Sequence, residues 1–292
     1  MLFGVGEPRM ADVREAVEVL AARPTIEGAG VRLRRAFGFA EVPRFDPFLM
    51  FDDFRSDRPE DYLAGFPWHP HRGMETVTYM LEGAIEHADS MGHAGTVGAG
   101  GVQWMTAGSG IVHQEMPKPV DGRMGGFQLW GNLPAAKKMM DPRYQEIPAD
   151  AIPVVHEEGA TARVIAGHHA GVYGPVTGIV VEPTFIDVTL EPSATFERPA
   201  PSERTGFAYV HGGTVAFGRT GRYISDCHTA RFGAGDAVFA EAGPNGGRFL
   251  IIAGRPIHEP VAWRGPVVMN TDDELREAFR ELKEGTFVKK HG

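Results

Sequence analysis

The sequence predicts an all-β fold built from two tandem β-barrels with a few short helices. Short runs rich in β-branched and aromatic residues alternate with glycine turns along most of the chain. Glycine and proline contribute 38 and 22 of the 292 residues without a three-residue repeat, which indicates turns between strands. The same order of strand-like segments also occurs in each half of the chain, which favours two similar barrels over one parallel α/β sheet.

The strand-like segments fall into two sets. The first set is VRLRRAF (31–37), PFLMFDDF (47–54), METVTYMLEG (74–83), VGAGGVQWMTAG (97–108) and GGFQLWGNLP (125–134). The second set is GIVVEPTFIDVTLEP (178–192), FAYVHGGTVAFG (207–218), GAGDAVFAEAG (233–243) and GRFLIIAG (247–254). Between them, residues 137–153 are polar and interrupted by prolines, so we interpret them as the crossover between two domains.

The two sets can be aligned on their glycines. Matching Gly83 to Gly213 places TVTYMLEG over FAYVHGG, and matching Gly98 to Gly233 places GAGGVQWMTAG over GAGDAVFAEAG. The identity is low, but the order and spacing agree. We therefore interpret the halves as a duplication of one barrel.

Two helices are predicted outside the barrels. Residues 11–22 carry apolar side chains at helical spacing and end before Pro24. Thr271 and Glu274 form a capping box that opens a helix through about Lys283. The predicted division is a helical extension (1–27), an N-terminal domain (28–150) and a C-terminal domain (151–292).

Composition limits the classes of protein to which the chain can belong. The formal charge is −9, and an acidic surface repels phosphate backbones, so direct binding of nucleic acid is not expected. A single cysteine, Cys227, forms no intrachain disulfide and fits a reducing compartment. No membrane span or signal peptide is evident, and we expect a cytoplasmic protein.

Two pairs of residues have the spacing of a metal site. His69 and His71 are two residues apart, as are His113 and Glu115, and in a strand such pairs lie on one face. If the two strands are neighbours, three imidazole nitrogens and one carboxylate oxygen surround a point, leaving two positions of an octahedral ion open. Glu75 has the same strand parity as the first pair, so spacing alone leaves it as an alternative carboxylate.

Other polar residues give weaker signals. His168 and His169 are adjacent and point to opposite faces of any strand. His87 and His93 lie in a turn-rich stretch and are expected to face solvent, although His87 could edge the pocket. Cys227 lies between Asp226 and His228, but neighbours in sequence rarely form a nucleophilic site. The apolar residues expected to line the pocket are Phe66, Trp68, Met105, Phe127 and Trp130.

The run GFPWHPHRGMETVTYMLEG at 65–83, continued through GSGIVHQEMP at 108–117, resembles the signature of the pirin family, a branch of the cupin superfamily. The likeness extends through VRLRRAFGF, DPFLMFDDF and the ending GPVVMNTDDELREAF, and covers most of the chain from about residue 28. The resemblance implies two tandem cupin (jelly-roll) barrels. It also implies that the metal ligands are His69, His71, His113 and Glu115, with Glu75 orienting a histidine.

The resemblance implies one divalent transition metal, Fe(II) first, with Mn, Ni, Cu or Zn as alternatives. In the aligned second half, the four ligands correspond to Pro199, Pro201, Arg248 and Leu250, so the C-terminal barrel is expected to bind no metal.

Two functions follow from the family. One is a quercetin 2,3-dioxygenase, which opens the ring of a flavonol-like aromatic substrate with O2 and releases carbon monoxide. Glu115 or Glu75 would then be the general base. The alternative is a non-catalytic iron-binding regulatory protein whose partner is a transcription factor or a metabolic enzyme.

Overall fold

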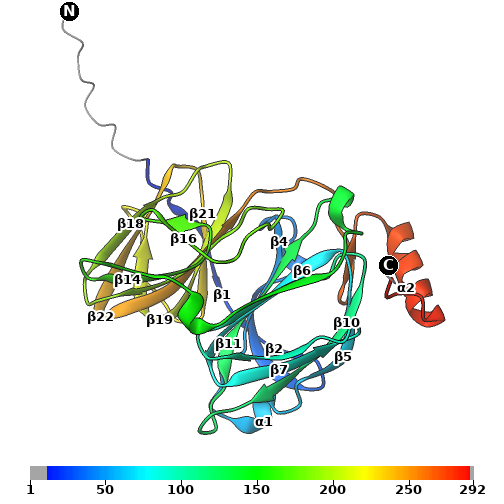
Figure 1. The fold of residues 1–292 in the computed structure, drawn as a ribbon. Coiled ribbons are helices and arrows are strands. Elements are labelled where there is room, and N and C mark those ends of the chain that lie inside the picture. The colour runs from blue at the N-terminus through cyan, green and yellow to red at the C-terminus, as the bar shows by residue number, and fades with distance from the viewer. Residues whose placement is uncertain (1–11, 290–292) are drawn as a thin grey trace, which may run out of the picture.

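The computed structural model describes residues 12–289, which form two β-barrels lying side by side (Figure 1). Their strands make three large sheets and two short hairpins, and the chain is mostly β, as predicted. No helix among residues 12–289 has the length and apolar character needed to cross a membrane.

The N-terminal barrel consists of two facing sheets. The larger has the order β12-β9-β6-β11-β4-β3-β2 and the smaller the order β5-β10-β7-β8. The strands are β2 (Arg23–Glu27), β3 (Val31–Phe37), β4 (Phe48–Asp53), β5 (Phe66–His71), β6 (Met74–Glu82), β7 (Ala84–Asp89), β8 (Ala94–Gly98), β9 (Val102–Thr106), β10 (Ile111–Lys118), β11 (Gly125–Asn132) and β12 (Arg143–Ile147). A short helix, α1 (Pro59–Tyr62), lies between β4 and β5.

The C-terminal barrel is one continuous sheet whose two longest strands bend. Its main order is β1-β21-β19-β22-β17-β14-β13, with β18 on β22 and β20 on β19. The strands are β1 (Ala16–Ala21), β13 (Val154–Glu157), β14 (Ala160–Ala166), β17 (Thr184–Leu190), β18 (Thr195–Pro199), β19 (Thr205–Phe217), β20 (Ile224–Ser225), β21 (His228–Phe232) and β22 (Ala237–Gly254). The two hairpins are β15 (His168–His169) with β16 (Val172–Tyr173), and β23 (Ala262–Arg264) with β24 (Val267–Met269).

The predicted helix at residues 11–22 is wrong for the part that the structure describes, which begins at residue 12. Residues 16–21 form β1 and pair with β21 of the C-terminal barrel, Ala16 opposite Phe232. Exposure alternates along β1, and Val17 and Val19 are exposed, which is a two-residue period and not a helical one. The segment therefore adds an edge strand to the sheet of the C-terminal barrel. Its position beside β21 corresponds to that of β12 beside β9 in the N-terminal barrel.

The predicted C-terminal helix is confirmed as α2 (Asp272–Glu284). Thr271 accepts a hydrogen bond from the Glu274 amide, the Glu274 carboxylate accepts one from the Thr271 amide, and Gly285 ends the helix with a φ of 73°. Although α2 follows the C-terminal barrel in the sequence, it packs beside β10 of the N-terminal barrel (Figure 1). Val112 of β10 packs against the apolar cluster that contains Leu275 and Ala278 of α2.

Two buried cations fasten this C-terminal segment to the N-terminal barrel. Arg72 donates to the Glu281 carboxylate at 2.6 Å and to the Phe287 carbonyl at 2.8 Å. The Lys138 ammonium donates to the Gly73 and Val268 carbonyls and to the Asn132 side chain, at 2.6–2.9 Å. Since Arg72 and Gly73 form the turn directly after β5, the C-terminal segment holds that turn in place.

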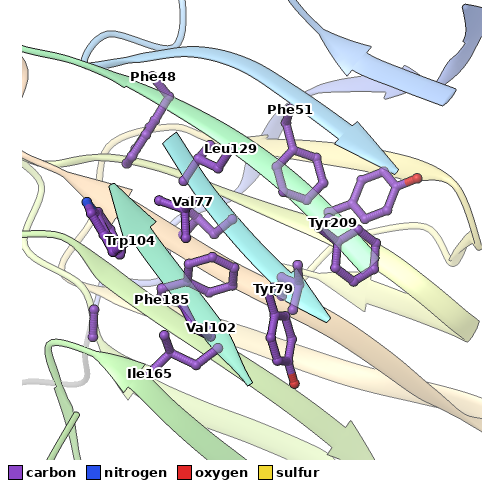
Figure 2. Packing of buried hydrophobic residues seen from close by; sticks show 14 of the residues in the cluster. Phe48, Phe51, Val77, Tyr79, Val102, Trp104, Leu129, Ile165, Phe185 and Tyr209 are labelled. Atoms are coloured by element: carbon purple, nitrogen blue, oxygen red, sulfur yellow. The ribbon is translucent and has the colours of Figure 1, made fainter. Parts of the chain in front are cut away.

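The largest apolar cluster lies between the barrels and takes residues from both (Figure 2). It packs Phe51, Val77 and Leu129 of the N-terminal barrel against Phe185 and Tyr209 of the C-terminal barrel. Such a shared core has the character of a domain interior and not of a polar interface between independent domains.

Two reciprocal hydrogen bonds cross this core. The Tyr79 hydroxyl of β6 donates to Asp187 of β17 at 2.8 Å, and the Tyr209 hydroxyl of β19 donates to Asp53 of β4 at 2.7 Å. All four side chains are buried. Within each barrel the tyrosine and the aspartate occupy matching positions on matching strands, so the interface repeats itself about an approximate twofold axis.

The structure also gives the register between the two halves. Gly83 follows β6 and Gly213 lies within β19, and their φ values of 69° and 63° agree with the alignment of these glycines. The second predicted alignment is wrong. Residues 237–242 pair with β18 and with the end of β19. In the N-terminal barrel, β10 has the equivalent pairing with β5 and β7. The segment 233–243 therefore corresponds to β10 and not to residues 98–108.

We expect Tyr79→Phe and Tyr209→Phe each to lower the free energy of unfolding by about 1–3 kcal/mol, because each leaves a buried carboxylate short of one donor. Urea unfolding of each variant measures the change. Tyr173→Phe is the control, because Tyr173 is 74% exposed. Equal stability of all three variants would contradict a stabilising role for the reciprocal bonds.

Candidate metal centre

The two residue pairs predicted from the sequence lie on neighbouring antiparallel strands. In the register of β5 and β10, His69 is opposite His113 and His71 is opposite Ile111. Glycines with positive φ precede both strands, Gly65 before β5 and Gly110 before β10. These turns bring the strands together with both histidines of β5 on one face.

The three histidine rings converge on one point. The Nε2 atoms of His69 and His113 are 3.0 Å apart, and a ligand atom from each of the three histidines lies within 4.8 Å of the other two. The Glu115 Oε2 atom is 3.9 Å from Nε2 of His113. The four residues thus offer three nitrogens and one carboxylate between the two sheets of the N-terminal barrel.

Burial keeps the imidazoles of His71 and His113 neutral. His71 is buried, and desolvation, together with the neighbouring His69 and His113, holds its pKa well below the usual range. Burial lowers the pKa of His113 to about 4, against the opposing effect of Glu115. Neutral imidazoles keep the lone pairs that a metal ion needs, so proton competition at neutral pH is small.

The carboxylate of Glu115 is held from two sides. Its Oε1 accepts a hydrogen bond from the Thr78 hydroxyl at 3.2 Å, and its Oε2 accepts one from the Gln128 amide at 3.4 Å. Thr78 belongs to β6 and Gln128 to β11, so the larger sheet positions the carboxylate of the smaller one. Neutral donors of this kind orient a ligand without neutralising its charge.

The residues fit a transition metal ion. Among residues 12–289, neither ring nitrogen of the buried His71 makes a hydrogen bond of good geometry, apart from a weak interaction with the Pro266 backbone. A buried imidazole without partners costs free energy, and coordination of an ion would satisfy it. Three imidazoles and a carboxylate suit Fe, Mn, Ni, Cu or Zn better than Mg or Ca.

A cavity of about 620 Å³ opens onto His69 and His71. Phe66 and Trp130 line it, as predicted, and Trp263 of β23 adds a wall from the C-terminal half. The other three predicted lining residues lie elsewhere: Trp68 is 53% exposed, Phe127 packs in the interface core, and Met105 packs with Ile111. Trp263 could not be assigned from the sequence, because it reaches the pocket only through the return of the C-terminal segment.

A polar group missed by the sequence analysis also lines this cavity. The Arg35 guanidinium donates to both Asp52 oxygens at 2.8 and 2.7 Å, and pairs with Glu27 at 2.9 Å. Burial raises the pKa of Asp52 to about 6, although Arg35 opposes the shift. The segment that the sequence predicted as a helical extension therefore contributes Glu27 to the pocket wall.

Glu75 does not lie with the histidines, which contradicts its predicted role beside the metal. It is on the face of β6 that carries Val77 and Tyr79, which face the interface core, and its Oε1 accepts from Thr106 at 2.7 Å. The predicted parity fails because the chain turns at Gly73, with a φ of 76°, and enters a different sheet.

Other residues from the sequence analysis take structural places. His87 is buried, stacks on Tyr144 and contacts Glu146, so the expectation that it faces solvent is wrong. Asp53, Asp226 and Cys227 also gather, but the Arg55 guanidinium pairs with both carboxylates. Burial and the two acids raise the pKa of Cys227, so its thiol is not activated.

The second barrel has different residues at the matching positions. The counterparts of His69, His71, His113 and Glu115 are Arg198, Ala200, Val238 and Ala240, in place of the predicted Pro199, Pro201, Arg248 and Leu250. None of these four is a histidine, a cysteine or a carboxylate.

Two barrels of this topology, with a cluster of histidines on β5 and β10 of the first, define a bicupin with a candidate metal centre. Residues 30–131 match the family model described as Pirin, and residues 185–288 match the Pirin C-terminal cupin domain. The chain belongs to the pirin family.

Similar proteins cover almost the whole chain. A pirin-like protein of Caulobacter vibrioides is 48% identical over 94% of this chain and 99% of its own length. Pirin of Homo sapiens is 41% identical over 94% of this chain and 96% of its own. A crystal structure of quercetin 2,3-dioxygenase from Acinetobacter baumannii matches with a TM-score of 0.85 and 31% identity, over 94% of this chain and 98% of that one.

Proposed function

We propose that His69, His71, His113 and Glu115 hold one divalent transition metal ion, Fe(II) before Mn, Ni, Cu or Zn. The proposal is supported by the convergence of three imidazole rings and by the unsatisfied nitrogens of His71. The 3.9 Å between Glu115 and His113 is within reach of one shared ion after a small side-chain adjustment.

The protein would act as a dioxygenase on a flavonol-like substrate. The observation that carries this proposal is the cavity of about 620 Å³ with aromatic walls, which opens onto two of the histidines. A volume of that order suits a small organic ligand. The similarity to a quercetin 2,3-dioxygenase of known structure supports the same substrate class.

The chain's own residues would bind and orient the substrate. Phe66, Trp130 and Trp263 offer apolar faces for planar rings. Arg35 and Asp52 offer a fixed donor and acceptor pair at the cavity wall for phenolic hydroxyl groups. The aromatic walls also limit the access of water to the reacting ring.

Glu115 would take the proton of the substrate's 3-hydroxyl group on Oε2, which faces His113. Thr78 and Gln128 hold the carboxylate during this transfer. A bound metal would supply Lewis acidity that lowers the pKa of the hydroxyl group. In the overall reaction both atoms of O2 enter the products, two ring C–C bonds break, and one carbon leaves as carbon monoxide, so an external reductant is not needed.

We expect His69→Ala and His113→Ala to lose stoichiometric metal while remaining folded, because the interface core is separate from the site. His156→Ala, at an exposed position on β13, is the control and should keep full metal content. Metal analysis of anaerobically purified protein, with circular dichroism as the test of folding, measures both outcomes. Full metal content in either site variant would contradict the ligand assignment.

Glu115→Gln should weaken metal binding at least tenfold, since even substitutions beyond the ligands cost about 10- to 100-fold. Glu75→Gln is a matched control, because Glu75 is equally buried but faces away from the histidines. Competition with a chelator measures both affinities. A larger loss for Glu75→Gln would reverse the assignment of the carboxylate.

Metal-replete protein should consume O2 and release carbon monoxide when quercetin is added, and His113→Ala should lose this activity. An oxygen electrode and the loss of flavonol absorbance follow the reaction. If the protein binds Fe(II) stoichiometrically yet consumes no O2 with any flavonol, the dioxygenase proposal fails while the metal site stands.

A further inference from the structure

The C-terminal barrel contains a second cavity, of about 550 Å³, at the place that matches the metal centre. Arg198 and Ala200, the counterparts of His69 and His71, both line it. We call this cavity the arginine pocket, because Arg14, Arg198 and Arg204 lie in its wall.

Arg198 is a buried cation without a compensating charge. It is 6% exposed, and within residues 12–289 no carboxylate lies within ion-pair distance of it. Its one hydrogen bond of good geometry goes to the His168 carbonyl at 3.1 Å, and its Nε has no partner in that part of the chain. A buried guanidinium normally has a paired anion, because an unpaired charge is costly in a low-dielectric interior.

The neighbouring cations do not relieve this imbalance. Arg14 is 3% exposed and donates to the backbone carbonyls of Gly233 and Pro201. Arg204 already pairs with Glu182 at 2.8 Å, and Glu182 also pairs with Arg255. Burial is the main cause, and the charge of Arg204 the second, that lowers the pKa of Arg198 to about 10. Arg198 is therefore still charged at neutral pH.

The shape and lining of the pocket indicate the kind of anion. Guanidinium groups bind carboxylates through paired N–H groups, and Arg198 has its Nε unused. Val176, Ile179 and Tyr173 add apolar and aromatic surface to the wall, which also contains Glu182, paired with Arg204, and Glu203, near Arg14. The volume is large enough for an organic molecule and exceeds what a simple ion needs.

We propose that the arginine pocket binds a small organic carboxylate, with its anionic group on Arg198 and its apolar body against Val176, Ile179 and Tyr173. In the first barrel the imidazoles would coordinate a metal cation. In the second barrel the guanidinium of Arg198 would bind an anion at the matching place. This site is independent of the proposed dioxygenase activity.

Calorimetric titration with benzoate tests the proposal on the full-length protein. Benzoate should bind, and Arg198→Met should weaken its binding by about 10- to 100-fold, the range expected for a charge-assisted pair of hydrogen bonds. Arg255→Met is the matched control, because Arg255 is 64% exposed and lies outside the pocket wall. Its affinity for benzoate should be that of the unsubstituted protein.

Two further probes separate charge from shape. Benzamide, which has the same ring without the charge, should bind at least tenfold more weakly than benzoate. Inorganic phosphate should also bind more weakly, because it lacks the apolar body. Equal affinity for benzamide would overturn the role of Arg198, and tighter binding of phosphate would overturn the assignment to an organic carboxylate.

Binding at the metal centre must be distinguished from binding at the arginine pocket. His113→Ala should bind benzoate as the unsubstituted protein does, whereas a loss confined to His113→Ala would overturn the proposal. Arg198→Met removes a buried charge and should melt no lower than the unsubstituted protein without ligand. If Arg198→Met does not fold, Arg198→Lys is the second variant, because it keeps the positive charge but lacks the paired N–H groups of the guanidinium. Undiminished benzoate binding by Arg198→Lys would also overturn the proposal.

Discussion

The shared core between the barrels is the constraint on which the rest of the structure depends. It buries Tyr79 and Tyr209 with their hydroxyl groups on Asp187 and Asp53 of the opposite barrel. A buried carboxylate without a donor costs more than the hydrogen bond itself contributes, so the two barrels have one relative orientation that satisfies both pairs. Successive side chains of a strand point to opposite faces of the sheet. The residues of β4, β6 and β11 that face the interface therefore determine which of their neighbours face the cavity.

Each of these three strands is a wall between the core and the candidate metal centre. On β4, Asp53 faces the interface and Asp52 lines the cavity. On β6, Tyr79 faces the interface and Thr78 holds Glu115. On β11, Leu129 packs in the core, while Gln128 and Trp130 line the cavity. A one-residue slip in any of them would exchange polar and apolar faces, so the register of the core positions the residues around the histidines.

The sequence predicted the barrels, α2 and the clustering of His69, His71 and His113, because these depend on local spacing: a two-residue period, a capping box and two pairs of residues two apart. The role of these residues and of Glu115 as metal ligands stays a prediction. The sequence failed where long-range pairing decides. Residues 16–21 have apolar positions compatible with a helix, but their partner β21 lies more than 200 residues away. Glu75 was misplaced because a single turn at Gly73 moves the chain into another sheet. The division of the chain at residue 150 remains a prediction, since β1 and α2 each pack on the barrel of the other half.

Each barrel contains a buried polar group whose hydrogen-bonding capacity the described chain does not satisfy, and these groups lie on the matching strands β5 and β18, in the walls of the two cavities. In the first barrel it is His71, a neutral donor of lone pairs; in the second it is Arg198, a donor of protons with a permanent charge. A packed barrel interior does not retain such groups for stability, since an apolar residue of similar size would cost less. In the core between the barrels, by contrast, the buried carboxylates of Asp53 and Asp187 accept hydrogen bonds from tyrosine hydroxyl groups. Under the two proposals made above, the barrels would hold ligands of opposite charge at matching places, because His69 of β5 would bind a cation and its counterpart on β18, Arg198, would bind an anion.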